Sequence, residues 1–208
     1  MPAGYAGTVG PEELCGATLT NHDLTGEVWI GAEIDELELD SSSLRRLRAA
    51  EGTWERCTFT DCDLTGADLA GLTTRDTGLV RCTLDGARLT GSSWLRSRMR
   101  EVRATEVVAD LLSAHSATWT DVTFTDATLR QIDLSGARLQ RVRFIDCDLS
   151  EARFAGLRAE QVTMTGCRLE RISGVDALRG VSMTHGDAVS GLGSFAEHLG
   201  ITLTEEGR

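Results

Sequence analysis

The residues of this chain that could bind a metal ion, form disulfides or act as nucleophiles are its six cysteines and four histidines. No two cysteines have the C-x-x-C spacing of a zinc site, and no Cys–His or Ser–His–Asp arrangement is recognisable. Paired carboxylates such as Asp61 and Asp63 lie among Ser, Thr and Asp residues that do not suggest a cleft. No glycine-rich phosphate loop is present in the sequence. We therefore expect no enzyme activity, no catalytic residue, no bound metal and no cofactor.

The spacing of the cysteines favours a structural role. Five of them share one phase of a five-residue period, namely Cys57, Cys62, Cys82, Cys147 and Cys167. Elsewhere this phase is mostly Ala or Val, and cysteine is itself a small side chain that is readily buried. Two pairs of these cysteines are 20 residues apart, so we expect each pair to stack as free thiols in a reducing compartment.

A second phase of the same period contains the large apolar residues. Steps of five from Leu14 to Leu169 give 32 positions, 26 of them large and apolar, and include all four Trp. A period of five fits neither an α-helix nor a plain strand, but it fits a coil that turns a corner every five residues. Four corners make a coil of about 20 residues, and such coils stack at the sheet spacing of about 4.8 Å.

The six small residues in this phase support a packed interior. Each has a large residue two positions earlier, in the pairs Leu47–Ala49, Leu72–Thr74, Val102–Ala104, Val107–Ala109, Leu112–Ala114 and Leu157–Ala159. This compensation predicts two inward positions per repeat that share one column of fixed volume. Gly or Asp often stands two residues after the large position, where a corner needs a residue that tolerates turn dihedrals.

The repeats Ala67-Asp68-Leu69-Ala70-Gly71 and Ala87-Arg88-Leu89-Thr90-Gly91 resemble the A-[DN]-L-x-x signature of the pentapeptide-repeat family. The resemblance covers roughly residues 12–173. It implies an all-β fold, a right-handed quadrilateral parallel β-helix of about eight coils. Residues 1–11 are expected to be a flexible leader. Residues 174–208 are expected to form a C-terminal cap with a short α-helix at about 187–199.

Charge is unevenly distributed along the chain. The net charge is −11, every basic residue is Arg, and residues 1–44 hold nine acidic residues and no Arg. Direct binding of nucleic acid is therefore disfavoured. Two interpretations of the acidic coils stay open, a solvated face and an electronegative patch that binds a basic partner surface. The candidate patch consists of Glu27, Glu33, Asp35, Glu36, Glu38 and Asp40.

The expected C-terminal helix has an apolar face that includes Val189, Leu192, Phe195 and Leu199. One interpretation is a cap over the unpaired edge of the last coil. The other adds homodimerisation, which the resemblance implies because gyrase-interacting family members pair through a C-terminal module. The sequence has no apolar run long enough to span a membrane and no signal-peptide pattern, so we expect a cytoplasmic protein that does not contact membranes.

Two binding functions remain open. The resemblance implies a DNA-mimicking partner of DNA gyrase, a type II topoisomerase, that protects it from fluoroquinolones or natural gyrase toxins. Residues 45–171 hold 18 acidic residues and 19 Arg, which disfavours DNA mimicry along the whole rod. The alternative is a generic pentapeptide-repeat scaffold that binds an unrelated protein.

Overall fold

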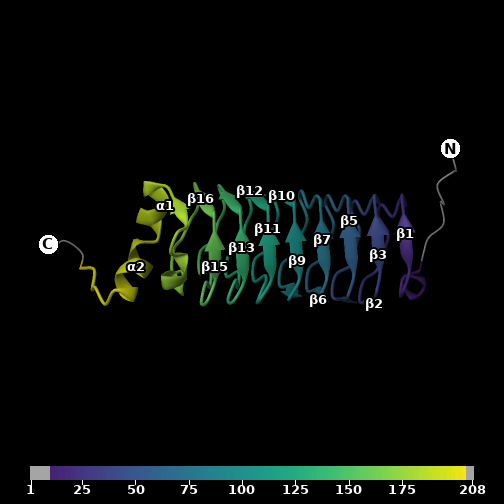
Figure 1. Cartoon of the computed structure of the whole chain (residues 1–208), viewed down its shortest axis with the longest axis horizontal. Helices are drawn as coiled ribbons and strands as arrows, with labels where there is room; N and C mark the ends of the chain where they lie inside the picture. Colours follow the sequence, from purple (N-terminus) through teal and green to yellow (C-terminus); the bar gives the residue numbers. More distant parts are fainter. Residues whose placement is uncertain (1–9, 205–208) are drawn as a thin grey trace.

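The five-residue period builds a parallel β-solenoid, which the computed structural model describes over residues 10–204 (Figure 1). Each coil takes 20 residues, because a residue on one strand pairs with the residue 20 positions later, as Thr58 does with Gly78 and Gly78 with Arg98. Backbone hydrogen bonds between coils therefore run along the rod. The predicted right-handed quadrilateral parallel β-helix of about eight coils with a short C-terminal helix is confirmed.

One side of the rod is a continuous eight-stranded sheet with one strand per coil. Its strands are β1 (Thr18–Thr20), β3 (Glu38–Asp40), β5 (Thr58–Thr60), β7 (Gly78–Val80), β9 (Arg98–Arg100), β11 (Thr118–Thr120), β13 (Arg138–Gln140) and β15 (Arg158–Glu160). In each strand the central residue points into the core and the two flanking residues point outward. We call the outward side of this sheet the eight-strand face.

The adjoining sides are regular over only part of their length. A four-stranded sheet holds β2 (Glu33–Asp35), β4 (Thr53–Glu55), β6 (Thr73–Arg75) and β8 (Ser93–Leu95). A five-stranded sheet holds β10 (Arg103–Thr105), β12 (Thr123–Thr125), β14 (Arg143–Ile145), β16 (Thr163–Thr165) and β17 (Ser182–Met183). The fourth side is joined by isolated bridges, such as Val28 to Arg48. Successive coils are thus joined on every side.

The core is the column of inward residues that the sequence pattern predicts. All four Trp side chains are fully buried, and Phe124 stacks on Phe144 with ring centroids 5.6 Å apart. Of the six compensated pairs, five are buried at both positions, and in the sixth Leu157 is buried and Ala159 partly buried. The interior therefore has a nearly constant cross-section, as close packing requires.

The corners use a left-handed backbone throughout. Each residue two positions after a central residue, from Gly16 to Arg171, has a positive φ, and 22 of these residues are not glycine. Nine of the ten corner glycines lie in turns closed by a hydrogen bond between residues three apart, as from the N–H of Ala67 to the carbonyl of Leu64. The corner aspartates, such as Asp61, lie at corners without that bond. The residue at a corner therefore correlates with the type of turn.

The C-terminal end closes the rod. After η2 (Val175–Leu178), the short strand β17 pairs with β16, and two helices follow, α1 (His185–Ser190) and α2 (Leu192–His198). The single helix expected at about 187–199 is thus two helices separated at Gly191. The first helix, α1, begins at His185, before the expected start at about residue 187, because Thr184 and Asp187 form a capping box. No helix in the described part of the chain is long and apolar enough to cross a bilayer.

The leader expected over residues 1–11 falls almost entirely on residues 1–9, which lie outside the described residues. Its last residue, Pro11, opens the short 3-10 helix η1 (Pro11–Glu13). Proline suits this first position, because it has no N–H that would need a partner there. The described solenoid therefore begins with η1 at the edge of the first coil.

Candidate interaction surfaces

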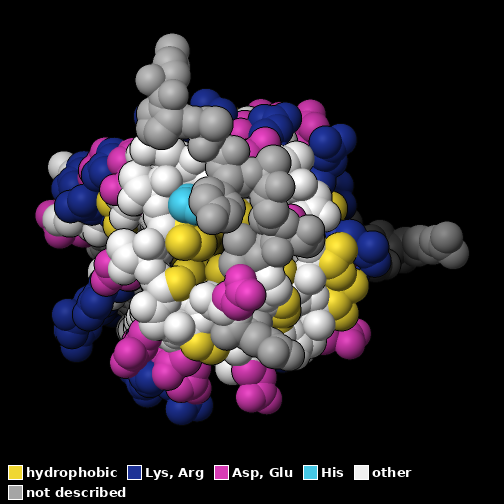
Figure 2. All heavy atoms as spheres, turned by 90° about the vertical axis from the view of Figure 1, so that its right-hand side faces the viewer, with side chains coloured by type: hydrophobic (Ala, Val, Ile, Leu, Met, Phe, Trp, Pro, Cys, Tyr) yellow, Lys and Arg dark blue, Asp and Glu magenta, His cyan; other side chains and the backbone are white. Residues whose placement is uncertain are grey.

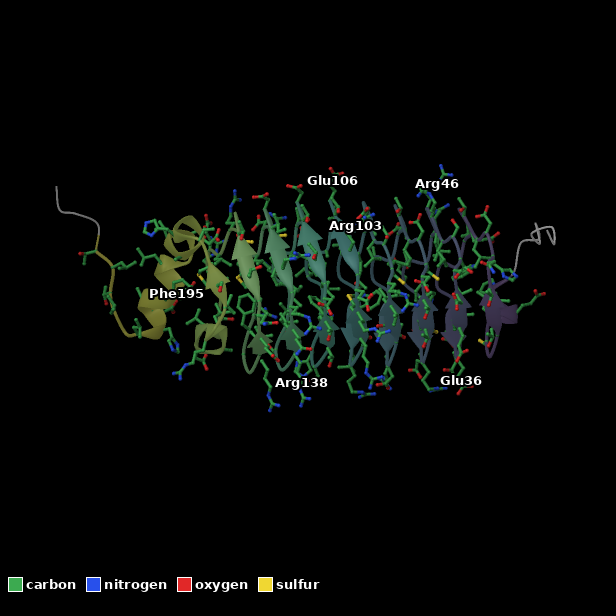
Figure 3. The ribbon with its side chains drawn as sticks, turned by 45° about the horizontal axis from the view of Figure 1, so that its top comes forward. Glu36, Arg46, Arg103, Glu106, Arg138 and Phe195 are labelled. Atoms are coloured by element: carbon green, nitrogen blue, oxygen red, sulfur yellow. The ribbon has the colours of Figure 1, made fainter. Side chains whose placement is uncertain are left out.

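The structure brings five of the six predicted acidic-patch residues together around one corner. Glu33 and Asp35 lie on β2, Glu38 and Asp40 lie on β3, and Glu36 is the corner residue between these strands. Figure 3 shows Glu36 on one long edge of the rod, near its N-terminal end. The sixth residue, Glu27, is separate, because it precedes the bridge at position 28 on the side of the coil opposite β3.

Part of this acidic charge is neutralised by the next coil. The guanidinium of Arg56 binds the carboxylate of Asp35 and lies 3.3 Å from Glu36 Oε1. Glu38 accepts a hydrogen bond of 3.4 Å from the hydroxyl of the threonine at position 18. Among the described residues, no cationic group forms an ion pair with the carboxylates of Glu33, Glu38 or Asp40. These three residues carry the uncompensated charge of the patch.

Beyond the second coil, acidic and Arg side chains form ladders along the rod. An Arg often stands 20 residues after a carboxylate and contacts it, at 2.6 Å for Arg81 with Asp61 and 2.8 Å for Arg96 with Asp76. The hydrogen bond from Arg81 lowers the pKa of Asp61 below its usual value. We did not predict these pairs, although the 20-residue separation of acid and Arg is visible in the sequence. Viewed along the rod, both charge types surround it (Figure 2).

The predicted C-terminal contacts divide into two groups. Phe195 is partly buried and packs against the buried core of the rod. Its ring also lies close to Gly191, between the two helices, because a Cβ placed on that glycine would be 2.9 Å from the ring. Val189, Leu192 and Leu199 stay 55%, 51% and 70% exposed. Phe195 therefore belongs to the cap at the end of the rod, where Figure 3 labels it. The other three residues are exposed apolar side chains of the C-terminal segment.

The cysteines are placed as the period predicts. Cys57, Cys62, Cys82, Cys147 and Cys167 are buried, and all six cysteines of the chain are free. Burial raises the pKa of Cys57 to about 11, and the hydrogen bond with Cys62 together with burial raises the pKa of Cys82. The described residues contain no cluster of three His, Cys, Asp or Glu side chains that could hold a metal ion. The buried thiols fill the interior as small apolar groups.

Surface hollows are shallow. One depression of about 350 Å³ lies over β11, β13 and β15, with Arg138, Gln140 and Arg158 in its lining. Another, of about 460 Å³, lies between the Arg–acid ladders near Arg130 and Glu151. Both are open to solvent and lined mainly by side chains of the regular repeat. The outer faces and the two ends of the rod are therefore the candidate functional surfaces.

The fold and its surfaces define a parallel β-solenoid built from five-residue repeats. A family model described as pentapeptide repeats (8 copies) matches residues 120–156 and 132–171, and the same register continues through the described coils. The chain belongs to the pentapeptide-repeat family. None of the curated proteins is significantly similar to it in sequence.

Several solved structures are similar to the chain. The pentapeptide repeat protein HetL, involved in heterocyst differentiation regulation in the cyanobacterium Nostoc sp. strain PCC 7120, is 18% identical with a TM-score of 0.34, over 81% of this chain and 90% of HetL. Full-length QnrB1, a plasmid-mediated fluoroquinolone resistance protein, is 18% identical with a TM-score of 0.30, over 89% of this chain and 100% of QnrB1. A pentapeptide repeat protein of the Arabidopsis thaliana thylakoid lumen is 18% identical with a TM-score of 0.25, over 57% of this chain and 75% of that one.

Proposed function

We propose that this chain is a non-enzymatic interaction solenoid that binds a basic protein surface through its acidic second coil. The main support for this proposal is that Glu33, Glu38 and Asp40 make no ion pair among the described residues. Their side chains project from two adjacent sides of one coil. Carboxylates fixed on a rigid β-scaffold attract a basic surface and orient it as it approaches.

We further propose DNA gyrase, a type II topoisomerase, as the partner. A surface that binds DNA is basic, and a rigid array of carboxylates presents it with charges like those of phosphates. Ladders such as Arg81 with Asp61 and Arg96 with Asp76 neutralise later coils, so the mimicry is confined to the N-terminal end of the rod. In this proposal the protein protects gyrase from fluoroquinolones or natural toxins.

A supercoiling titration of gyrase, with and without a fluoroquinolone, tests this partner. The informative variant is Glu33→Arg, because Glu33 is exposed on β2. Its matched control is Glu106→Arg, since Glu106 is an exposed glutamate on the opposite edge of the rod from Glu36 (Figure 3). We expect Glu33→Arg to weaken inhibition or protection and Glu106→Arg to retain it. No effect of the unmodified protein on gyrase would exclude this partner.

The alternative partner is an unrelated protein, with the rod as a generic scaffold. The ladders favour it, because the central coils present alternating charge rather than a uniformly acidic array. Co-purification of a specific protein other than gyrase, lost in Glu33→Arg, would support this alternative. Binding retained in Glu33→Arg would place the contact on another face.

We also propose that the exposed apolar side chains of Val189, Leu192 and Leu199 join two copies at their C-terminal ends. Removing such side chains from water favours association. Leu192→Asp with Leu199→Asp is expected to abolish this pairing, as measured by light scattering after size exclusion. Val108→Asp is the matched control, because Val108 is an exposed apolar residue on the solenoid itself. Unchanged mass in the double variant would contradict the proposal.

A further inference from the structure

The eight-strand face is uncovered, and its centre carries small residues. Within the described part of the chain, no helix lies over this face (Figure 1). Thr58 and Thr60 project from β5, and Gly78 and Val80 flank the buried central residue of β7. A Cβ on Gly78 would have nothing within 4 Å, so no contact inside the described chain requires glycine there. A strand glycine often marks the close approach of another backbone.

Opposite charges lie on either side of this centre. Glu38 and Asp40 project from β3, two strands before β7 in the sheet, and Arg98 and Arg100 project from β9, the strand after β7. Three strand spacings, or about 14 Å, separate the acidic strand from the basic one, so these groups do not pair within one chain. All four side chains are exposed.

We propose that the eight-strand face binds the same face of a second copy, with the two rods antiparallel. The twofold axis lies between the two faces, parallel to the strands and midway between β5 and β7. This operation places β3 of one copy over β9 of the other. Glu38 then faces Arg98 of the second copy, and Asp40 faces Arg100. The symmetry repeats both pairs, so residues that are too far apart to pair within one chain pair between two.

The rest of the overlap is also complementary. The two outward threonines of β1 face those of β11, and Thr58 and Thr60 face Gly78 and Val80. The small residues at the centre allow the sheets to approach closely. Corner residues along the edges also match, in the pairs Glu36 with Arg96, Arg56 with Asp76, and Asp61 with Arg81. In this arrangement no like charges face each other across the overlapping strands β1 to β11 of the eight-strand face.

Other arrangements of the same face are less complementary. If the two rods were parallel, Glu38 of one copy would face Asp40 of the other. Arg98 would likewise face the arginine at position 100 of the other copy, so like charges would repel at both positions. An antiparallel overlap of all eight strands pairs Glu38 with an arginine on β13 but places Asp61 against Asp121. A shift by one strand in either direction leaves the charges of β3 and β9 opposite uncharged residues. Charge thus selects both the direction and the register.

This contact goes beyond the proposed function and competes with part of it. It covers Glu38 and Asp40 but leaves Glu33, on the adjoining side, exposed. Strands β13 and β15 and the C-terminal helices lie outside the overlap, so pairing through the C-terminal end remains compatible with it. Glu33 therefore reports on partner binding alone and Arg98 on self-association alone, whereas Glu38 and Asp40 take part in both contacts.

Sedimentation equilibrium of the full chain tests the pairing. Leu192→Asp with Leu199→Asp serves as background, so that C-terminal pairing does not contribute. We expect a dimer whose dissociation constant rises about tenfold or more in Glu38→Arg and in Arg98→Glu, because each places like charges together. Combining both substitutions is expected to return it to within about threefold of the background, because the pairs reform with reversed polarity.

Arg153→Glu is the matched control, because Arg153 is an exposed Arg on another side of the rod. It is expected to leave the dimer unchanged. A background protein that stays monomeric, or a double variant that associates no better than Glu38→Arg, overturns the proposal. Either result leaves the gyrase titration of Glu33→Arg unaffected, so failure of the two proposals is distinguishable.

Cross-linking tests the register. Thr18→Cys and Thr118→Cys are combined with Cys15→Ser, which removes the exposed native thiol. Within one chain the new thiols lie five strand spacings apart, about 24 Å, beyond the reach of a disulfide or a short cross-linker. Sheets packed face to face lie about 10 Å apart, farther than a disulfide spans, so a bismaleimide with a spacer of about 10 Å is the cross-linker. We expect a cross-linked dimer in the double-cysteine protein and none with Thr18→Cys alone. A double-cysteine protein that yields no more dimer than this control contradicts the register.

Discussion

The carboxylate of Asp187 accepts a hydrogen bond of 2.7 Å from the backbone N–H of Cys167, one coil length of 20 residues earlier in the chain. A second cap residue acts in the same way, because the Ser190 hydroxyl accepts a hydrogen bond of 3.0 Å from the N–H of Leu169. One coil earlier, the N–H of Leu149 is bound by a backbone carbonyl of the next coil. The Ser190 hydroxyl thus takes the place of the backbone carbonyl that a further coil would supply, and the Asp187 carboxylate fixes α1 to the last coil.

Asp187→Ala is expected to destabilise the protein by about 2–4 kcal/mol, because it leaves a buried N–H without a partner and removes the capping box of α1. The free energy of unfolding from urea denaturation measures this. Asp176→Ala is the control, since Asp176 is exposed in η2, and it is expected to change stability by less than about 0.5 kcal/mol. Equal losses in the two variants would show that Asp187 does not support the last coil.

The corner at Leu111 gives a prediction of the opposite sign. Leu111 has a φ of 60° and its side chain is 56% exposed, so its left-handed backbone is not offset by burial. Leu111→Gly is expected to stabilise the protein by about 0.5–1 kcal/mol, because glycine adopts this backbone without steric cost. Val108→Gly serves as control, since Val108 lies in the same repeat without a positive φ and should lose stability. A thermal melt that falls in both variants would contradict the role of the corner.

The sequence was sufficient to predict the core and the corners, because both repeat every five residues. The pairing of Leu112 with Ala114 and the burial of Cys57 follow from one register. The cap was less predictable, because Asp187 acts through a backbone group that is distant in sequence and Gly191 divides the helix. The outward charges follow no five-residue rule, and their pairing depends on the 20-residue coil.

Acid is expected to weaken the ladders. Hydrogen bonds from Arg81 and Arg141 lower the pKa values of Asp61 and Asp121 in the folded protein. A carboxylate with a lowered pKa stabilises the fold fully above its unfolded pKa of about 3.9, and this contribution is lost as pH falls through the lower folded value. Urea denaturation at a series of pH values below about 5 should therefore show falling stability.

Arg141→Gln identifies the source of this loss. It removes the partner of Asp121, so the variant should lose less stability than the unmodified protein between neutral and acid pH. Arg153→Gln is the control, because Arg153 makes no ion pair among the described residues, and it should keep the full pH dependence. An identical pH dependence in all three proteins would exclude the ladder as a source of acid sensitivity.

The pair Leu112 and Ala114 tests whether adjacent inward positions share one volume. Both side chains are buried, at 1% and 0% exposure. Leu112→Ala is expected to cost about 2–5 kcal/mol through the cavity it leaves. Ala114→Leu is expected to cost about 1–3 kcal/mol through overpacking.

The double variant Leu112→Ala with Ala114→Leu restores the usual arrangement of the repeat, with a small residue before a large centre. Because it refills the cavity with the added side chain, it should cost at least about 1 kcal/mol less than the sum of the single changes. Ala114→Leu combined with Leu47→Ala is the matched control, since Leu47 is buried in a distant coil and its cost should simply add. Urea denaturation of the single and double variants measures these differences. Additive costs in the neighbouring pair would mean that the two positions pack independently, and the compensation seen along the sequence would need another cause.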